Sequence, residues 1–213
     1  MPVAGEKIDL CDIIPTGYIK ESYVGGSISI QLLDYQGYAV EGSTYRWFDD
    51  EDGTAWFDAY DEEVKPRAVT YNPGDALWVQ GNAATESLRS SGEVANGSID
   101  VYLRAGAMLV NNPMPVAIPF NDDNKDGKFI APSGYIKDSY VGGSISAQKL
   151  DYQGYAVEGS TYRWFDDEDG TAWFDAYDEE VEGEALQPGE AIWVQANSTS
   201  EKLNFPSPLQ KDL

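Results

Sequence analysis

The sequence predicts an all-β protein: a tandem of two similar sandwich- or barrel-like domains joined by a structured β segment. The first observation is a duplication, since residues 15–64 match residues 132–181 at all but four of fifty positions. The second is that short runs of strand-forming residues alternate with turns rich in Gly, Asp and Asn, without a sustained helical period. Looser matches extend the unit to about a hundred residues. The predicted domains are therefore 1–96 and 113–213, with 97–112 between them.

A hairpin is the most regular predicted element of each copy, at residues 45–58 and 162–175. Two Trp-Phe pairs flank an acidic turn that ends in Asp-Gly, where glycine can take the positive φ of a tight reversal. In the first copy, polar and apolar residues alternate over 27–32, which predicts a half-buried strand. Further strands are expected at 38–40 and 76–80, with at most a short helical turn in 9–14.

The segment between the copies is expected to be structured and not a flexible tether. Ile99, Val101 and Leu103 alternate with polar residues, and a second apolar run follows them. If the segment pairs with both domains, the outer edge of each domain lacks a strand and invites another chain. The sequence therefore suggests self-association, head-to-tail or edge to edge, by strand addition. The alternative is that these edges are capped locally.

Composition excludes several classes of function. The chain has 37 acidic and 14 basic residues and a net charge of −23, so nucleic acids and anionic membranes are disfavoured as partners; either cation binding or simple solvation fits this charge. There is no histidine, which removes the usual general base and the commonest transition-metal ligand. The single cysteine, Cys11, lies in an apolar run, where a buried apolar role is expected. We expect no enzyme activity.

No apolar run is long enough for membrane insertion, and no leader is recognised in the sequence. The expectation from this pattern is either that export does not use that route or that a leader is absent from the chain shown.

Calcium is the one cofactor that the sequence suggests. Asp122, Asn124 and Asp126 alternate as oxygen ligands, and Gly127 holds the sixth position, as at the opening of a calcium loop. The match is partial because the twelfth position is Ser133 and not a bidentate acid. An ordinary turn is the alternative. The acidic hairpin tips supply further candidate ligands, for which plain solvation is the alternative: Asp50, Asp52, Asp167 and Asp169.

Aromatic residues beside acids suggest a carbohydrate-binding surface. The candidate residues are Trp56 and Tyr60 in the first copy and Trp173 and Tyr177 in the second. Exposed rings can stack on a polysaccharide, and duplication would add avidity. The alternative is that the tryptophans build the core. Paired carboxylates also suggest glycoside hydrolysis, but acids are dense throughout this chain and a duplicated compact domain rarely leaves a deep cleft.

Two of the four differences between the copies share one strand face. Ile30 and Leu32 correspond to Ala147 and Lys149. Because lysine is seldom buried without a partner, we expect Leu32 to be more buried than Lys149 and this face to be an interface that distinguishes the copies. Drift at a half-exposed edge would give the same substitutions.

Three motifs follow one another along the chain, Ser-Ile-Ser-Ile-Gln-x-Leu-Asp, Tyr-Arg-Trp and Pro-Gly-x-Ala-x-Trp-Val-Gln, with residues 105–113 between the copies. This arrangement resembles uncharacterised secreted β-repeat proteins of environmental and gut bacteria. The resemblance implies an exported, repeat-built surface or matrix protein. The expected function is a structural or assembly component of a cell surface, extracellular filament or particle, with a carbohydrate-binding module as the alternative.

Overall fold

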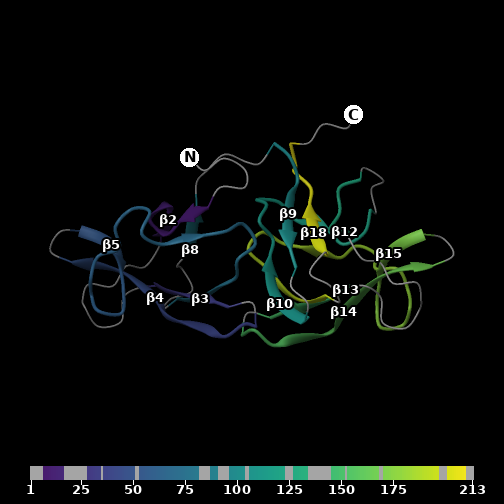
Figure 1. Cartoon of the computed structure of the whole chain (residues 1–213), viewed down its shortest axis with the longest axis horizontal. Helices are drawn as coiled ribbons and strands as arrows, with labels where there is room; N and C mark the ends of the chain where they lie inside the picture. The colour runs from purple at the N-terminus through teal and green to yellow at the C-terminus, as the bar shows by residue number, and fades with distance from the viewer. Residues whose placement is uncertain are drawn as a thin grey trace. The chain divides into compact units, whose positions relative to one another are not determined.

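The structure is a computed structural model, and it describes residues 7–16, 28–34, 36–50, 53–81, 87–90, 96–103, 106–122, 127–133, 145–151, 153–167, 170–196 and 201–209. The chain divides into two compact units, unit 1 (1–93) and unit 2 (94–213). The described part of both units is built from strands in several sheets, which confirms the all-β class (Figure 1). A single 3-10 turn, η1 (Leu10–Asp12), lies where a short helical turn was expected.

Unit 1 contains one antiparallel sheet of four strands in the order β5-β4-β3-β7. Two small sheets accompany it, β1 with β6 and β2 with β8. The strand bounds are β1 Ile8–Asp9, β2 Ile13–Thr16, β3 Ile28–Leu33, β4 Ala39–Asp50, β5 Gly53–Phe57, β6 Thr70–Tyr71, β7 Leu77–Gly81 and β8 Ser87–Ser90.

Unit 2 repeats this plan with one strand more in each of two sheets. The large sheet has the order β10-β17-β13-β14-β15, and the small sheets are β11 with β16 and β12-β18-β9. The strand bounds are β9 Ile99–Tyr102, β10 Gly106–Asn111, β11 Ile118–Pro119, β12 Ala131–Ser133, β13 Ile145–Leu150, β14 Ala156–Asp167, β15 Gly170–Phe174, β16 Ala185–Leu186, β17 Ala191–Ala196 and β18 Lys202–Phe205.

The expected hairpin is present in both units as β4–β5 and β14–β15. It forms because aromatic and β-branched residues favour the pleated strand, while Gly53 and Gly170 adopt the positive φ that other residues resist. Trp47 lies opposite Trp56, and their rings meet edge to face with centroids 5.4 Å apart. The acidic residues at the tips, 51–52 and 168–169, lie outside the described residues.

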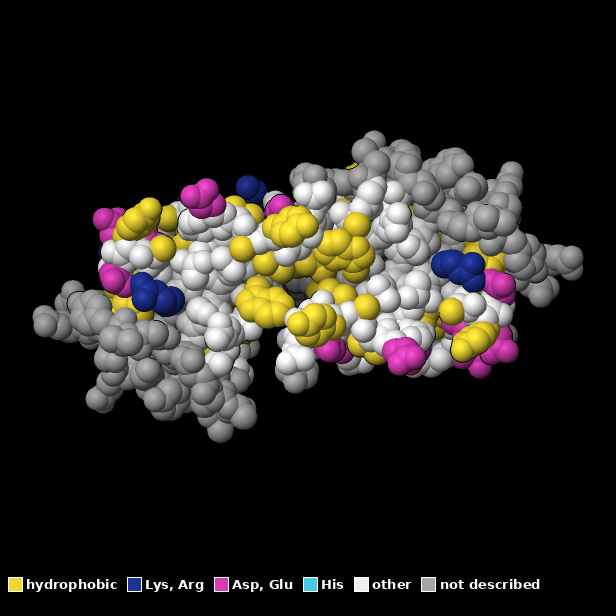
Figure 2. Space-filling model, turned by 90° about the horizontal axis from the view of Figure 1, so that it is seen from below, with side chains coloured by type: hydrophobic (Ala, Val, Ile, Leu, Met, Phe, Trp, Pro, Cys, Tyr) yellow, Lys and Arg dark blue, Asp and Glu magenta, His cyan; other side chains and the backbone are white. Residues whose placement is uncertain are grey.

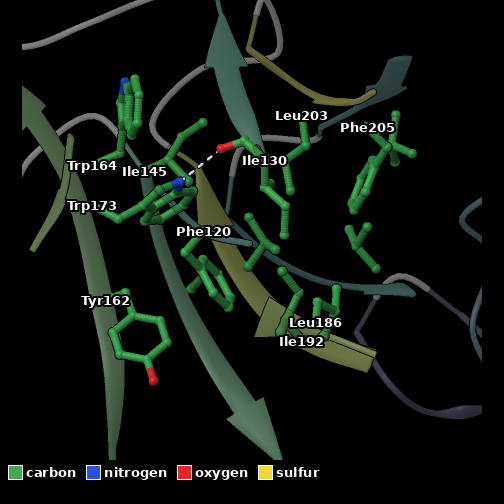
Figure 3. Close-up of a cluster of buried hydrophobic side chains, with 14 of the residues drawn as sticks. Phe120, Ile130, Ile145, Tyr162, Trp164, Trp173, Leu186, Ile192, Leu203 and Phe205 are labelled. Carbon is green, nitrogen blue, oxygen red and sulfur yellow. Dashed lines mark hydrogen bonds between the residues drawn. The ribbon is translucent and has the colours of Figure 1, made fainter. Parts of the chain in front are cut away.

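The second tryptophan of each hairpin is the anchor of the core. Trp56 and Trp173 are fully buried, and each indole N–H donates at 2.8 Å to the carbonyl of an isoleucine, Ile13 in unit 1 and Ile130 in unit 2. Figure 3 shows the bond between Trp173 and Ile130. The bond satisfies the one polar atom of the ring and holds that segment against the hairpin. The alternative in which the tryptophans build the core is therefore the one found.

The core residues differ between the units in a compensating way. Phe120 stands where unit 1 has Leu10, because both backbone N–H groups bond the carbonyl of the same loop position. Ala147 stands where unit 1 has Ile30, and all four side chains are buried. The larger ring in unit 2 accompanies the smaller strand residue, and it meets Tyr162 edge to face at 4.8 Å. The larger ring therefore fills part of the space that the smaller strand residue leaves in a close-packed interior.

The expected contrast between Leu32 and Lys149 is not found, because both are half-buried. The Lys149 ammonium lies 3.1 Å from the Glu184 carboxylate and donates to the Ala185 carbonyl at 3.4 Å. In unit 1 the position of Glu184 is held by Val69, and both Val69 and Leu32 pack against the core. Two apolar residues of unit 1 thus correspond to an ion pair in unit 2. The sequence pattern does not show that Glu184 lies beside Lys149. The Glu184 carboxylate pairs with the lysine ammonium, while the aliphatic part of the lysine side chain stays packed.

Exchanging this pair should show coupling between its two members. Lys149→Leu and Glu184→Val are each expected to lower the free energy of unfolding of unit 2, while the double variant, which restores the unit 1 pair, recovers part of the loss. The pair is partly exposed, so the coupling energy should be about 0.3–1 kcal/mol. A double-mutant cycle in urea measures it, and strictly additive single effects would contradict the assigned pairing.

Candidate functional site

Both strands of the segment 97–112 pair within unit 2. β9 pairs with β18, and β10 pairs with β17 along its whole length. The segment is structured, as its alternation indicated, but its described strand partners all belong to unit 2. Pairing with both units is therefore not observed in this part of the chain. The large sheet of unit 2 therefore has an edge strand, β10, that has no counterpart in the described large sheet of unit 1.

β10 completes the core of unit 2 as well as its sheet. Leu109 and Val110 of β10 are buried. On the neighbouring strand β17, Val194 is fully buried, with an exposed fraction of 0%. Met108 lies opposite Val194, and Leu109 lies opposite Trp193. Burial of these side chains removes apolar surface from water, and each well-buried aliphatic chain contributes about 1.5–3 kcal/mol.

β9 is held to β18 by a polar cluster in addition to the backbone ladder. The Asp100 carboxylate accepts from the Lys202 ammonium at 2.5 Å and from the Asn204 amide at 2.8 Å. The hydrogen bonds from Asn204 and Lys202 hold the pKa of Asp100 below its ordinary value, and the bond to Asp100 raises the pKa of Lys202. The cluster therefore favours the ionised carboxylate and the charged ammonium, and it pins the register of β9.

Asn112 fixes the end of β10. Its buried side-chain amide donates to the carbonyls of Val116 at 2.8 Å and Leu186 at 2.9 Å, and its side-chain oxygen accepts from the Met114 N–H. Since a buried amide without partners is costly, these three bonds specify one position for the chain after β10.

In unit 1 the sheet edge equivalent to β17 is β7, and it is open. Trp78 is 41% exposed and Val79 is 44% exposed, although the same register positions in unit 2, Trp193 and Val194, are half-buried and fully buried. Among the described residues, β7 pairs with β3 alone. We name the outer side of β7 the open edge. The open edge combines two features: exposed apolar side chains, and backbone hydrogen-bonding groups that pair with no other described strand.

Within the described ranges, the edge of β8 is open in the same sense. β8 pairs with β2 in a two-stranded sheet, whereas its equivalent β18 carries both β12 and β9. The alignment of β2 with β12 places Leu88 at the position of Leu203 and Arg89 at the position of Asn204. Leu203 is fully buried, while Leu88 is half-buried and Arg89 is exposed. Unit 1 therefore shows, at β7 and β8, the two surfaces that β9 and β10 cover in unit 2.

The residues considered for sugar binding separate into two groups. Trp56 and Trp173 lie in the core and cannot meet a ligand at the surface, which corrects their choice as binding residues. Tyr60 and Tyr177 are each 84% exposed, on a loop that Asp58 and its counterpart order by accepting two backbone N–H bonds.

An arginine ties each of these loops to its hairpin. Arg46 pairs with Asp61 and bonds the Asp58 carbonyl, and in unit 2 Arg163 pairs with Asp178 in the same way. Both aspartates take a positive φ of 64°, so the turn itself is repeated. On the face drawn in Figure 2, each unit shows a basic side chain close to acidic ones. The two tyrosines are therefore exposed in the same way, and among the described residues no aromatic ring packs against either of them.

Only some of the candidate calcium ligands are among the described residues. Asp122 is described, and both of its carboxylate oxygens accept from the Gly127 N–H, at 3.1 and 3.0 Å. Asn124, Asp126, Asp52 and Asp169 lie outside the described residues, as do the side chains of Asp50 and Asp167. Within the described ranges, no group of three metal-ligating side chains comes together. Calcium binding stays a prediction.

Asn121 and Cys11 are structural equivalents that sequence comparison did not align. The Asn121 amide donates to the Trp173 and Val181 carbonyls, while the Cys11 thiol meets the Val64 carbonyl at 3.5 Å. Burial and the neighbouring Asp9 raise the pKa of the Cys11 thiol, which disfavours the reactive thiolate. Cys11 is half-buried and serves packing, in line with its apolar surroundings.

No family model, curated protein or solved structure matches this chain in the three comparisons made. No helix in the described ranges has the length and apolar character needed to cross a bilayer. The function is therefore inferred from the geometry above.

Proposed function

We propose that this chain is a structural component of a cell surface, extracellular filament or particle, and that it joins other subunits by strand addition at the open edge of unit 1. The observation that carries this proposal is the difference between β7 and β17. The same sheet edge is covered by β10 in unit 2 and exposes Trp78 and Val79 in unit 1. In this reading the two units are tandem domains of a repeat-built protein.

The sequence of β7 supports assembly over mere exposure. Edge strands are normally protected by a lysine, a proline, a bulge or short length. β7 reads Leu77-Trp78-Val79-Gln80-Gly81 and has neither a charge nor a proline. The net charge of −23 opposes close approach of two chains over long range, but physiological salt screens it beyond about 8 Å. Local pairing along β7 brings no charged side chains of that strand together.

Light scattering across a concentration series tests the proposal. The wild-type mass is expected to rise with concentration, while Val79→Lys should keep the mass of one chain, because a lysine at the open edge cannot be covered without desolvation. Val157→Lys is the matched control, since Val157 is 39% exposed and belongs to β14 of unit 2 and not to the open edge. A wild-type protein that stays monomeric throughout, or a Val79→Lys variant that associates equally, would contradict the proposal.

A carbohydrate-binding module is the second candidate, and the repeated exposure of Tyr60 and Tyr177 favours it. Two identical rings at fixed loops would bind a repetitive polysaccharide with avidity. Affinity electrophoresis in polysaccharide gels separates the candidates: retardation that Tyr60→Ala with Tyr177→Ala abolishes supports sugar binding, whereas unchanged mobility in every gel argues against it.

A further inference from the structure

We propose that the open edge of unit 1, together with the edge of β8, accepts in trans a strand pair with the sequence pattern of β9–β10. This inference rests on the proposed function and names the partner. The occupant is an extended segment from another polypeptide that forms two short strands: apolar residues alternate with an acid in the first strand and follow one another in the second. Unit 2 supplies the template, because β17 and β18 carry that segment in cis.

The template fixes the register on β7. Val194 corresponds to Val79 and Trp193 to Trp78, since each pair lies opposite equivalent residues of β13 and β3. The incoming strand therefore places its Met108-type residue opposite Val79 and its Leu109-type residue opposite Trp78. Successive side chains of a strand point to opposite faces, so a shift by one residue would turn the Met108-type and Leu109-type side chains to the opposite faces of the sheet.

The same template assigns a charge contact on β8. In unit 2, Asp100 lies opposite Asn204, which donates to it. Arg89 holds the position of Asn204 in unit 1 and is exposed. An acid at the Asp100 position of the incoming strand would therefore meet an arginine, which offers a charge-assisted bond in place of the amide. The edge is thus complementary to the β9–β10 pattern in charge at Arg89 as well as in the apolar side chains of Trp78 and Val79.

An intact second copy of this chain can pair edge to edge along β7, but it is a poorer donor of a β9–β10 strand pair than a free segment. Its own β9–β10 strands already cover β17 and β18, so donation would uncover one edge for each edge that it covers. This exchange leaves the number of open edges unchanged, so it buries no additional apolar surface. The favoured occupant is a segment of this pattern that is not engaged in a unit of its own.

Cysteine pairing with a synthetic peptide of residues 97–114 tests the register. The protein is the full chain with Cys11→Ala and either Val79→Cys or Trp78→Cys, and the peptide carries Met108→Cys or Leu109→Cys. Opposite residues alternate between wide and narrow pairs, so both in-register combinations, 108 with 79 and 109 with 78, are tried. We expect a disulfide in at least one of them. The offset combinations 108 with 78 and 109 with 79 should give little.

Matched variants locate the site and the charge contact. Val194→Cys should crosslink poorly, because β10 of the same chain already covers it. A peptide with Asp100→Lys should bind about tenfold more weakly, and Arg89→Glu in the protein should restore its binding.

The outcomes separate this inference from the proposed function. One outcome is that the folded protein forms no crosslink to the peptide at position 78 or 79, while its mass still rises with concentration and the rise depends on Val79. That outcome overturns the β9–β10 partner but not the proposed assembly. Crosslinking in the expected register by a protein that remains monomeric supports the partner while self-association fails. Equal crosslinking of in-register and offset pairs overturns the inference as well.

Discussion

Replacing Trp173 by alanine is expected to lower the free energy of unfolding of unit 2 by about 3–5 kcal/mol, the range for removing a large buried aromatic side chain. The side chain is fully buried, contacts Trp164 and Phe120 edge to face, and donates its indole N–H to Ile130. The variant loses the packing of the ring, leaves a cavity, and strips a buried carbonyl of its donor. Urea unfolding followed by circular dichroism measures the loss.

Two further variants separate packing from hydrogen bonding. Trp173→Phe keeps most of the ring but removes the donor, so a loss of about 1–3 kcal/mol is expected from the unpaired Ile130 carbonyl. Trp56→Ala makes the same change in unit 1, where Ile13 is the acceptor. Hydrogen exchange assigns each effect to its unit through peptides that cover β7 or β17, whose sequences differ. A Trp173→Ala protein as stable as wild type would contradict the anchoring role.

The second large effect is expected from one substitution made at two equivalent positions. Val194→Asp should destabilise unit 2 by several kcal/mol, on the order of 3–5, because it buries a carboxylate without a partner beneath β10. Val79→Asp should change the stability of unit 1 by less than about 1 kcal/mol, because that side chain is 44% exposed.

The comparison tests the open edge without reference to any partner. Chemical denaturation gives the two free energies, and hydrogen exchange in β7 and β17 shows which unit responds. Val79→Ala and Val194→Ala serve as uncharged controls, with a small loss in unit 1 and a larger one in unit 2, since only Val194 leaves a cavity. Equal losses at positions 79 and 194 would mean that β7 is covered, which would contradict the site itself.

The local elements of this protein could be predicted because they depend on short-range patterns. The strand over 27–32 appears as β3, and the aromatic hairpins appear as β4–β5 and β14–β15. Alternation at period two and a glycine at the reversal suffice for such elements. The structured nature of residues 97–112 was predictable for the same reason.

The partners of these elements were not predictable from pattern. Lys149 looked unpaired until the fold placed Glu184 beside it, thirty-five residues away along the chain. Trp56 and Trp173 were candidates for a binding surface, with the core as the alternative, because an amphipathic ring is favourable in either setting. The open edge could be suspected from the position of residues 97–112 after one copy and before the other, but its residues Trp78, Val79 and Arg89 were not singled out.

The sequence by itself determined the all-β class, the duplication, the hairpins and the absence of histidine-based chemistry. Only the tertiary structure decided which unit takes the β9–β10 segment. The segment follows the first copy of the repeat and precedes the second, and its apolar residues suit either sheet. The choice depends on long-range contacts in unit 2: Asp100 with Lys202 and Asn204, and Asn112 with the Leu186 carbonyl. These contacts bury and pair the segment in one unit, and in the described part of the other they leave β7 with an uncovered edge.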